Sequence, residues 1–134
     1  MAVFTSELVF ETGGYFDIVD LTARVEGAVR ASDIREGIAL VYAGHATGVI
    51  ILNELERALL DDLRELMASL APADGVYHHP VNSRSHLLSM LFTPSRTVPV
   101  HGGRLGLGTW QSLYWVEAER RPRRRRVEVT VVGE

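Results

Sequence analysis

Two short apolar runs, separated by a few small residues, set the strongest limit on how this chain can fold. Residues 37–43 read GIALVYA and residues 48–52 read GVIIL, and each run has the length of a strand. The intervening residues, Gly44 to Gly48, predict a hairpin. An apolar strand on each side places the single histidine of this turn, His45, close to the core.

The leucine spacing after the second run predicts a long amphipathic helix. The leucines recur three or four residues apart and form one apolar stripe: Leu52, Leu55, Leu59, Leu63, Leu66 and Leu70. Asn53 followed by Glu56 is a variant of the capping box, so the helix is expected to begin at Asn53. Pro72 and Gly75 end it.

The remaining elements follow from alternation, turn residues and caps. Strands are expected over 3–11, 15–19, 97–100, 104–117 and 126–132, and helices over 21–31 and 83–91. A Gly-Gly turn at 101–104 predicts a second hairpin. Short hairpins around a central group of helices predict an α+β fold, with a mainly antiparallel sheet or sandwich and helices packed on one face. The 134 residues fit one domain, spanning residues 1–134.

Two residue types are missing, and their absence narrows the chemistry. The chain has no cysteine, which excludes disulfides, thiolate metal sites and a cysteine nucleophile. It also has no lysine, which excludes Schiff-base chemistry. No run of about 18 apolar residues and no secretory leader is present, so a cytoplasmic protein without a membrane partner is expected.

The positive charge is concentrated in one segment. Six of the 14 arginines lie in residues 120–126, whereas the rest of the chain is acidic. No aromatic residue interrupts this arginine run, so a solvated hairpin or an intersubunit salt-bridge segment is favoured over a nucleic-acid site.

Histidine is the strongest candidate for metal binding or proton transfer in this composition. His79 and His86 are seven residues apart, in a loop and in the first turns of a helix, and His45 lies on a separate turn. Three imidazoles from different elements could hold a divalent ion such as Zn²⁺ and leave a fourth position open. The alternative is that each histidine makes ordinary loop or capping hydrogen bonds.

Two further polar pairs adjoin apolar strands. Asn53 and Glu54 suit a helix N-terminus as cap and dipole partner, but Glu54 could also act as a general base. In the predicted strand 104–117, Thr109 and Gln111 share one face and could point into a pocket. The alternative is that this pair is solvated and Trp110 on the other face belongs to the core.

An ordered series of motifs resembles the YjbQ-like family, whose members are often described as secondary thiamine-phosphate synthases. In order along the chain, the motifs are GHATGVIILNE, YHH, NSRSH, VPVHGGRLGLGTWQ with the following YWVE, and the terminal RRRVEVTVVGE. The series covers nearly the whole chain. Two departures affect the pocket: Ala46 lacks a hydroxyl that the family's turn carries, and the loop at Pro80–Val81 is short.

The resemblance implies a homotrimer with a polar pocket near a subunit boundary. It implies that His45, His79 and His86 cluster there, around a divalent metal or as proton carriers. The neighbours that it implies are Asn53, Glu54, Asn82, Thr109 and Gln111. Weak joining of a pyrimidine diphosphate to a thiazole phosphate is the implied activity.

Three functions remain open from the sequence. The first is an enzyme that acts on a small phosphorylated substrate, with His45 and His86 as catalytic groups and Glu54 as a base. The second is a non-catalytic homotrimer that binds a small anion, a metabolite or a metal with the same pocket. The third is a scaffold in which the histidines are structural.

Overall fold

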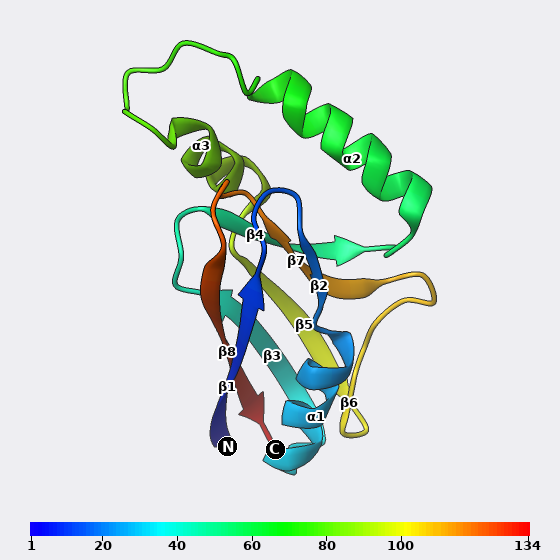
Figure 1. The fold of residues 1–134 in the computed structure, drawn as a ribbon. Helices are drawn as coiled ribbons and strands as arrows, with labels where there is room; N and C mark the ends of the chain where they lie inside the picture. The colour runs from blue at the N-terminus through cyan, green and yellow to red at the C-terminus, as the bar shows by residue number, and fades with distance from the viewer.

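The computed structural model describes residues 1–134 and contains two antiparallel sheets and three helices (Figure 1). The elements in chain order are β1 (Ala2–Thr12), β2 (Ile18–Asp20), α1 (Thr22–Ser32), β3 (Glu36–Ala43), β4 (Gly48–Asn53), α2 (Arg57–Leu70), α3 (Ser83–Phe92), β5 (Ser95–His101), β6 (Arg104–Leu105), β7 (Ser112–Glu117) and β8 (Arg123–Gly133). The predicted α+β class and mainly antiparallel pairing are confirmed.

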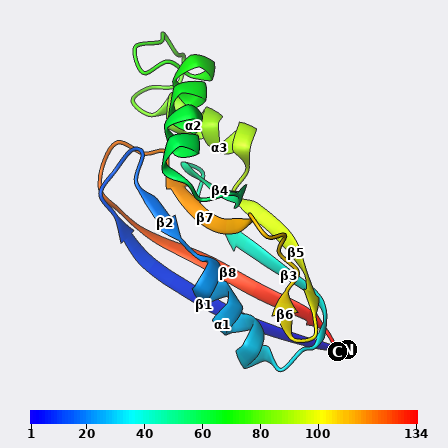
Figure 2. The ribbon, with the colours of Figure 1, turned by 90° about the vertical axis from the view of Figure 1, so that its right-hand side faces the viewer.

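The larger sheet has the strand order β1-β8-β3-β5-β6 and forms one layer of the molecule (Figure 2). Every neighbouring pair in it is antiparallel. Alternation along β8 buries Arg125, Val127, Val129 and Val131 on one face. An arginine therefore occupies the first position of an otherwise apolar inward row.

The smaller sheet, β2-β7-β4, is covered on both faces. One face joins α1 and the large sheet in the main core through Ile50, Leu113 and Trp115. The other face packs in a second cluster with residues of α2 and α3, through Val49, Ile51, Tyr114 and Val116. Double burial explains why the run at 48–52 has no polar alternation.

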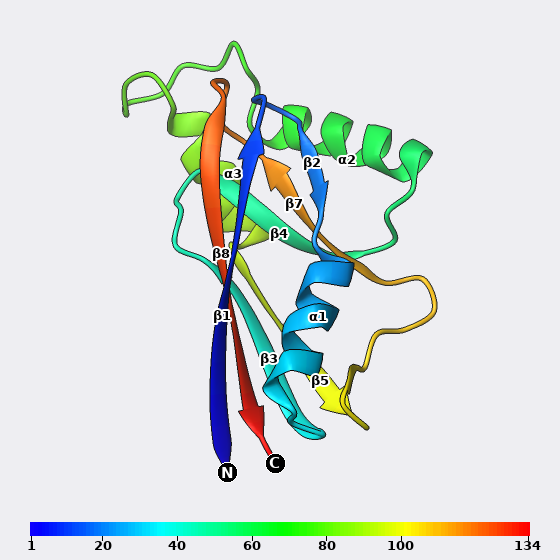
Figure 3. The same cartoon turned by 60° about the horizontal axis from the view of Figure 1, so that its bottom comes forward.

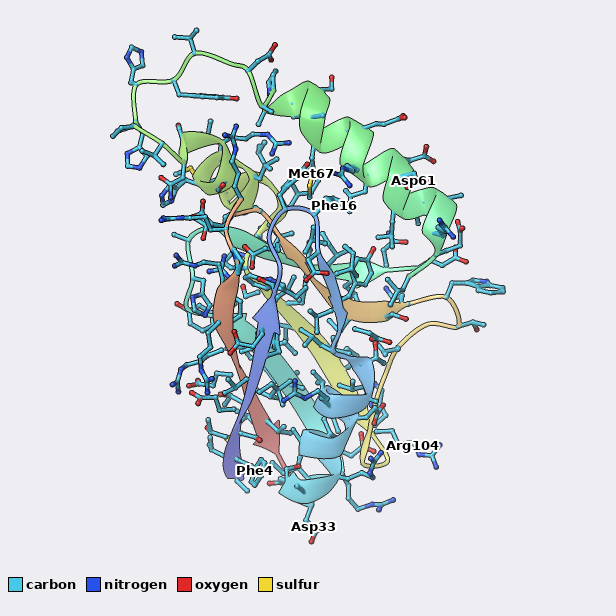
Figure 4. All side chains as sticks on the ribbon, in the orientation of Figure 1. Phe4, Phe16, Asp33, Asp61, Met67 and Arg104 are labelled. Atoms are coloured by element: carbon cyan, nitrogen blue, oxygen red, sulfur yellow. The ribbon has the colours of Figure 1, made fainter.

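Helices α2 and α3 cover the end of the molecule that carries the small sheet, while α1 lies beside the strands (Figure 3). Met67 is the buried residue of α2 and faces the body of the molecule near Phe16, whereas Asp61 points outward (Figure 4). Leu66 and Leu70 of the predicted stripe are about half exposed. No helix has the length and apolarity needed to cross a membrane.

Three predictions about local structure are wrong. Residues 44–48 do not form a hairpin, because β3 and β4 belong to different sheets and the segment is a corner between them. Residues 104–117 are not one strand, because the chain leaves the large sheet after β6 and re-enters at β7. Helix α2 begins at Arg57, because the carboxylate of Glu56 caps it by accepting from the amides of Ala58 and Leu59, at 2.6 and 3.0 Å.

The Gly-Gly hairpin is confirmed. His101 pairs with Arg104 across the β5–β6 turn, and both Gly102 and Gly103 have positive φ, at 57° and 78°. This backbone conformation carries a penalty for residues with a Cβ atom, so the two glycines account for the turn.

Candidate functional site

The most deeply buried charged groups are Glu117, at the end of β7, and Arg125, in β8. Their side chains are 0% and 1% exposed. Arg125 Nε donates to Glu117 Oε1 at 2.8 Å, and its Nη2 donates to Oε2. Thr12 Oγ1 and Trp115 Nε1 also donate to Oε1, at 2.7 and 3.3 Å. Donors therefore surround the carboxylate on both oxygens.

The electrostatics of Glu117 are set by two opposed effects. Burial alone would raise the pKa of its carboxyl group, because a charge is poorly solvated in the interior. Hydrogen bonds from Arg125, Thr12 and the Glu119 backbone outweigh burial and hold the pKa below its ordinary value. The pair is thus ionised in the folded protein, and its network ties β1, β7 and β8 together.

His45 lies at the corner between the two sheets, next to this network. Its Nε2 accepts a hydrogen bond from the backbone N–H of Arg126 at 2.9 Å. Its ring meets the Trp115 ring edge-on, with centroids 6.2 Å apart. Burial, reinforced by the charge of Arg125, lowers the pKa of His45 below its ordinary value, so the ring is neutral near pH 7.

His79 and His86 form a separate pair at the start of α3. Their ring centroids are 5.0 Å apart and the planes are nearly perpendicular, at 89°. His79 Nε2 lies 3.2 Å from Asn82 Oδ1, and Asn82 Nδ2 donates to Glu119 Oε2 at 3.1 Å. Because Asn82 offers its oxygen to His79, Nε2 of His79 is the protonated nitrogen.

Two cavities adjoin this histidine pair. A cavity of about 230 Å³ is lined by polar groups that include His79, Asn82, Ser83, Glu119 and Arg120. A second cavity, of about 430 Å³, is lined by His86 together with His45, Tyr42, Ser89 and Met90. The three predicted histidines therefore line adjacent cavities, and the His79–His86 contact connects the two.

The donor set of the single chain does not fit a three-histidine metal site. No group of three or more His, Asp or Glu side chains is arranged to hold an ion. The Nε2 lone pair of His45 is already engaged by the Arg126 amide, and in the neutral ring Nδ1 then carries the proton. His79 and His86 alone are too few for the four-coordinate zinc sites common in proteins.

The family comparison agrees with this architecture. The family model described as "UPF0047 protein YjbQ-like" matches residues 6–134. The chain belongs to this family. It is 40% identical over 136 residues to a UPF0047 protein of Methanothermobacter thermautotrophicus, a match that covers 99% of this chain and 94% of the relative. A UPF0047 protein of Archaeoglobus fulgidus is 40% identical over 126 residues, covering 92% of this chain and 97% of the relative.

Solved structures of YjbQ-like proteins share the whole fold. A crystal structure described as a YbjQ-like protein of unknown function from Sulfolobus solfataricus P2 has a TM-score of 0.95 at 31% identity, and the match covers 99% of both chains. A hypothetical protein from Aeropyrum pernix K1 has a TM-score of 0.90 at 33% identity, covering 97% of this chain and 98% of that one. These comparisons place the chain in a family of unknown function.

In this YjbQ-like chain, Asn53 and Glu54 lie at the opposite end of β4 from the His45 corner. Six residues of β4 separate the two ends, which corresponds to a distance of about 16 Å or more. Asn53 accepts from the amide of Glu54 at 2.7 Å instead of capping α2. The single chain therefore does not bring Glu54 to the histidines.

Thr109 and Gln111 also lie outside the histidine region. They belong to the loop between β6 and β7, where both side chains are exposed and Gln111 Oε1 accepts from the Gly108 amide at 2.9 Å. The interpretation of Trp110 as a core residue is wrong, because its side chain is 73% exposed. Glycines at 106 and 108 let the chain turn where strand periodicity was expected to continue.

Three of the six arginines in the run pair with carboxylates of the same YjbQ-like chain. Arg124 pairs with Glu11 at 3.3 Å and Arg126 with Glu7 at 2.9 Å, both on β1 and both exposed. Arg125, between them, points inward to Glu117. Strand alternation thus divides the run between the outer surface and the interior.

Sequence reasoning missed the buried pair of Glu117 and Arg125 and the role of Glu119. A signal was present for Glu117, because a carboxylate ends the otherwise apolar strand LYWVE and must find a partner if it is buried. The signal for Arg125 was its position two residues before Val127, which places it on the same strand face as the alternating valines of β8. Neither pattern alone identifies the partner.

Proposed function

We propose that this protein binds a small phosphorylated molecule at the His79–His86 pair and acts on it by a thiamine-phosphate-synthase-type transfer. The observation that carries the proposal is the polar cavity in which His79, Asn82 and Arg120 surround the start of α3. The alternative is a non-catalytic homotrimer that binds a small anion with the same groups.

The first turn of α3 supports phosphate binding. Asn82 occupies the cap position but makes no side-chain bond to the helix, because its amide group is engaged by His79 and Glu119. The first amides of a helix have no partner within the helix, and they attract anions through both hydrogen bonding and the helix dipole. The guanidinium of Arg120 adds further donors to the same cavity.

The chemistry of the proposed transfer matches these groups. The carbon–oxygen bond between the pyrimidine methylene and pyrophosphate breaks, and the thiazole nitrogen supplies the electron pair for the new carbon–nitrogen bond. Negative charge grows on the departing pyrophosphate, where helix amides and Arg120 would stabilise it. His86 is half-buried beside His79 and lines the adjacent cavity, from which it would exchange a proton with the leaving group.

The exposed motif residues support a site completed by further copies of the chain. Asn53, Thr109 and Gln111 are exposed and line neither of the two histidine cavities. Trp110, between Thr109 and Gln111, is mostly exposed. Apolar side chains on α2 are exposed as well, at Leu59, Leu66 and Leu70. A homotrimer would cover these residues and could bring the polar ones of one protomer to the cavities of its partner.

Replacing His86 with alanine is the direct test of catalysis. We expect formation of thiamine phosphate from the pyrimidine diphosphate and the thiazole phosphate to fall by about 100-fold, because a positioned proton carrier contributes on that scale. His101→Ala is the matched control, since His101 is an exposed histidine paired with Glu36 at the β5–β6 turn. Phosphate binding without turnover in the wild type would favour the non-catalytic alternative, and absence of both would refute the proposal.

Replacing Leu66 with glutamate tests the proposed assembly. We expect light scattering to report a trimer for the wild type and a monomer for Leu66→Glu, because the substitution places a charge in an apolar contact. Asp61→Ala is the control on the outward side of the same helix. A monomeric wild type at micromolar concentration would contradict the assembly.

A further inference from the structure

We infer that His45 is a neutral hydrogen-bond donor that offers its Nδ1–H to an oxyanion in the cavity it shares with His86, and that Arg125 is the residue that positions it. This inference rests on the proposed function for the nature of the ligand. It assigns His45 a role different from that of a metal ligand.

The tautomer of His45 follows from its backbone contact. The N–H of Arg126 is a peptide amide, which can only donate, so Nε2 must be the acceptor in their 2.9 Å hydrogen bond. A neutral imidazole carries its single proton on the other nitrogen, here Nδ1. Binding a cation at Nε2 would require this hydrogen bond to break and would leave the amide without its partner.

The contact exists because β3 leaves the large sheet at the corner. The β3–β8 ladder ends at the pair Ala43 and Val127, one residue after Arg126 on β8. The imidazole of His45 then takes the place of the departing strand as acceptor for the next amide of β8. The turn residues on either side of His45, Gly44 and Ala46, are small and exposed, and they line the same cavity.

Arg125 holds both segments that fix the ring. Its backbone precedes the amide of Arg126, and its Nη2 donates to the carbonyl and the hydroxyl of Thr47 at 3.2 and 3.0 Å. Thr47 lies two residues after His45 on the same corner. Because Glu117 anchors the guanidinium in the interior, one buried side chain sets the distance between β8 and the corner.

The remaining nitrogen is available to a ligand. Nδ1 of His45 makes no hydrogen bond within the chain, whereas every buried side-chain nitrogen and oxygen atom has a partner. The half-buried ring lines the cavity of about 430 Å³ together with His86 and Ser89. An N–H group selects a hydrogen-bond acceptor. The proposed transfer has two phosphorylated substrates, so one phosphate can lie at the start of α3 while an oxygen of the other accepts from His45.

Nitrogen-15 NMR of histidine-labelled protein tests the tautomer without reference to activity. We expect the His45 ring at neutral pH to show a protonated Nδ1 and an unprotonated Nε2, with the Nδ1 resonance moving on titration with inorganic phosphate. In a folded Arg125→Met variant, we expect the His45 ring to lose its single defined tautomer, because the residue that positions it is gone. An unchanged tautomer in this variant would show that Arg125 does not position the ring. A protonated Nε2 in the wild type would overturn the inference.

Two substitutions separate the nitrogens of His45. His45→Asn keeps a donor near the position of Nδ1, and His45→Gln places an acceptor near the position of Nε2. We expect His45→Gln to weaken phosphate binding by about 10- to 100-fold, the effect of losing a hydrogen bond to a charged group, and His45→Asn to weaken it by less than about fivefold. His45→Gln should have a higher melting temperature than His45→Asn, because only glutamine can accept the hydrogen bond from the Arg126 amide.

The outcomes distinguish the inference from the proposed function. If the wild type binds neither phosphate nor pyrophosphate, the proposed function fails and the ligand role of His45 fails with it. If the wild type binds phosphate and His86→Ala weakens binding but His45→Gln does not, only the inference fails. Stoichiometric Zn²⁺ binding by the wild type that both His45 variants abolish would show a metal ligand instead.

Discussion

Glu117→Gln is expected to lower the free energy of unfolding by about 3–5 kcal/mol, the usual cost of leaving one member of a buried ion pair without its partner. The carboxylate is fully buried and accepts from Arg125, Thr12 and Trp115. A neutral amide cannot balance the guanidinium, and its NH₂ group would meet donors where the carboxylate offers acceptors. Urea denaturation of the two proteins measures the difference.

Two comparisons make this prediction specific. Glu11→Gln removes a carboxylate from an exposed pair on the same sheet, with Arg124, and should leave the urea midpoint almost unchanged. Replacing both buried residues, as Glu117→Leu with Arg125→Met, should recover much of the lost stability because neither ion remains to be desolvated. Equal midpoints for the wild type and Glu117→Gln would show that the pair contributes nothing.

Lowering the pH should reduce the difference in free energy of unfolding between the wild type and Glu117→Gln. The folded protein lowers the pKa of Glu117, so its contribution to stability is fully present above the carboxyl pKa of the unfolded chain. That contribution is lost as the pH falls through the lowered pKa of the folded state, where the carboxylate becomes protonated. The stabilities of the wild type and Glu117→Gln should therefore converge in acid, and a constant difference down to low pH would contradict this account.

Gly48→Ala is expected to lower the free energy of unfolding by about 3 kcal/mol or more, which is at or above the upper end of the range for overpacked protein cores. A Cβ atom at this first position of β4 would lie 2.0 Å from Cζ2 and 2.3 Å from Cη2 of the Trp115 indole. Trp115 is fully buried and cannot move aside, because it contacts Glu117 and the edge of the His45 ring. Thermal unfolding followed by circular dichroism measures the loss.

The same substitution at Gly27, Gly27→Ala, should stabilise the protein instead. Gly27 lies within α1, and the nearest atom to an added Cβ is Nη2 of Arg30 at 4.0 Å. Alanine is the better helix former by up to about 1 kcal/mol, so Gly27→Ala should raise the melting temperature. If Gly48→Ala is as stable as the wild type, the Trp115 indole can shift to accommodate the added methyl group, and the prediction is wrong.

The sequence predicts elements well where periodicity is local. The leucine spacing identifies α2, the Gly-Gly pair identifies the β5–β6 turn, and alternation identifies β8. It cannot assign β3 and β4 to different sheets, because two apolar runs with a short connection look the same whether they pair with each other or with distant strands. The strand predicted over 104–117 fails because Leu105 and Leu107 maintain an alternating pattern across the point where the chain turns away.

Sequence spacing predicts which site residues lie close together only where they belong to one helix or the loop beside it. Asn82 and His86 are four residues apart at the start of α3, and His79 reaches Asn82 from the preceding loop, so their proximity could be anticipated. Asn53 and Glu54 follow β4 directly, yet an extended strand carries them away from His45. The Glu117–Arg125 pair depends on the register of β8 against β1 and β3, which no short motif encodes.

The corner between the two sheets also determines how this family could acquire a new ligand preference. Thr47 and Gly48, which directly follow the cavity-lining residues of the His45 corner, are buried. Arg125 hydrogen-bonds Thr47, and Trp115 leaves no room for a side chain at Gly48, so substitutions at these two positions destabilise the fold. On the α3 side, Met90 lines the same cavity while 72% of its surface is exposed. Laboratory evolution of specificity should therefore accumulate its first tolerated substitutions on α3, with the corner conserved as its support.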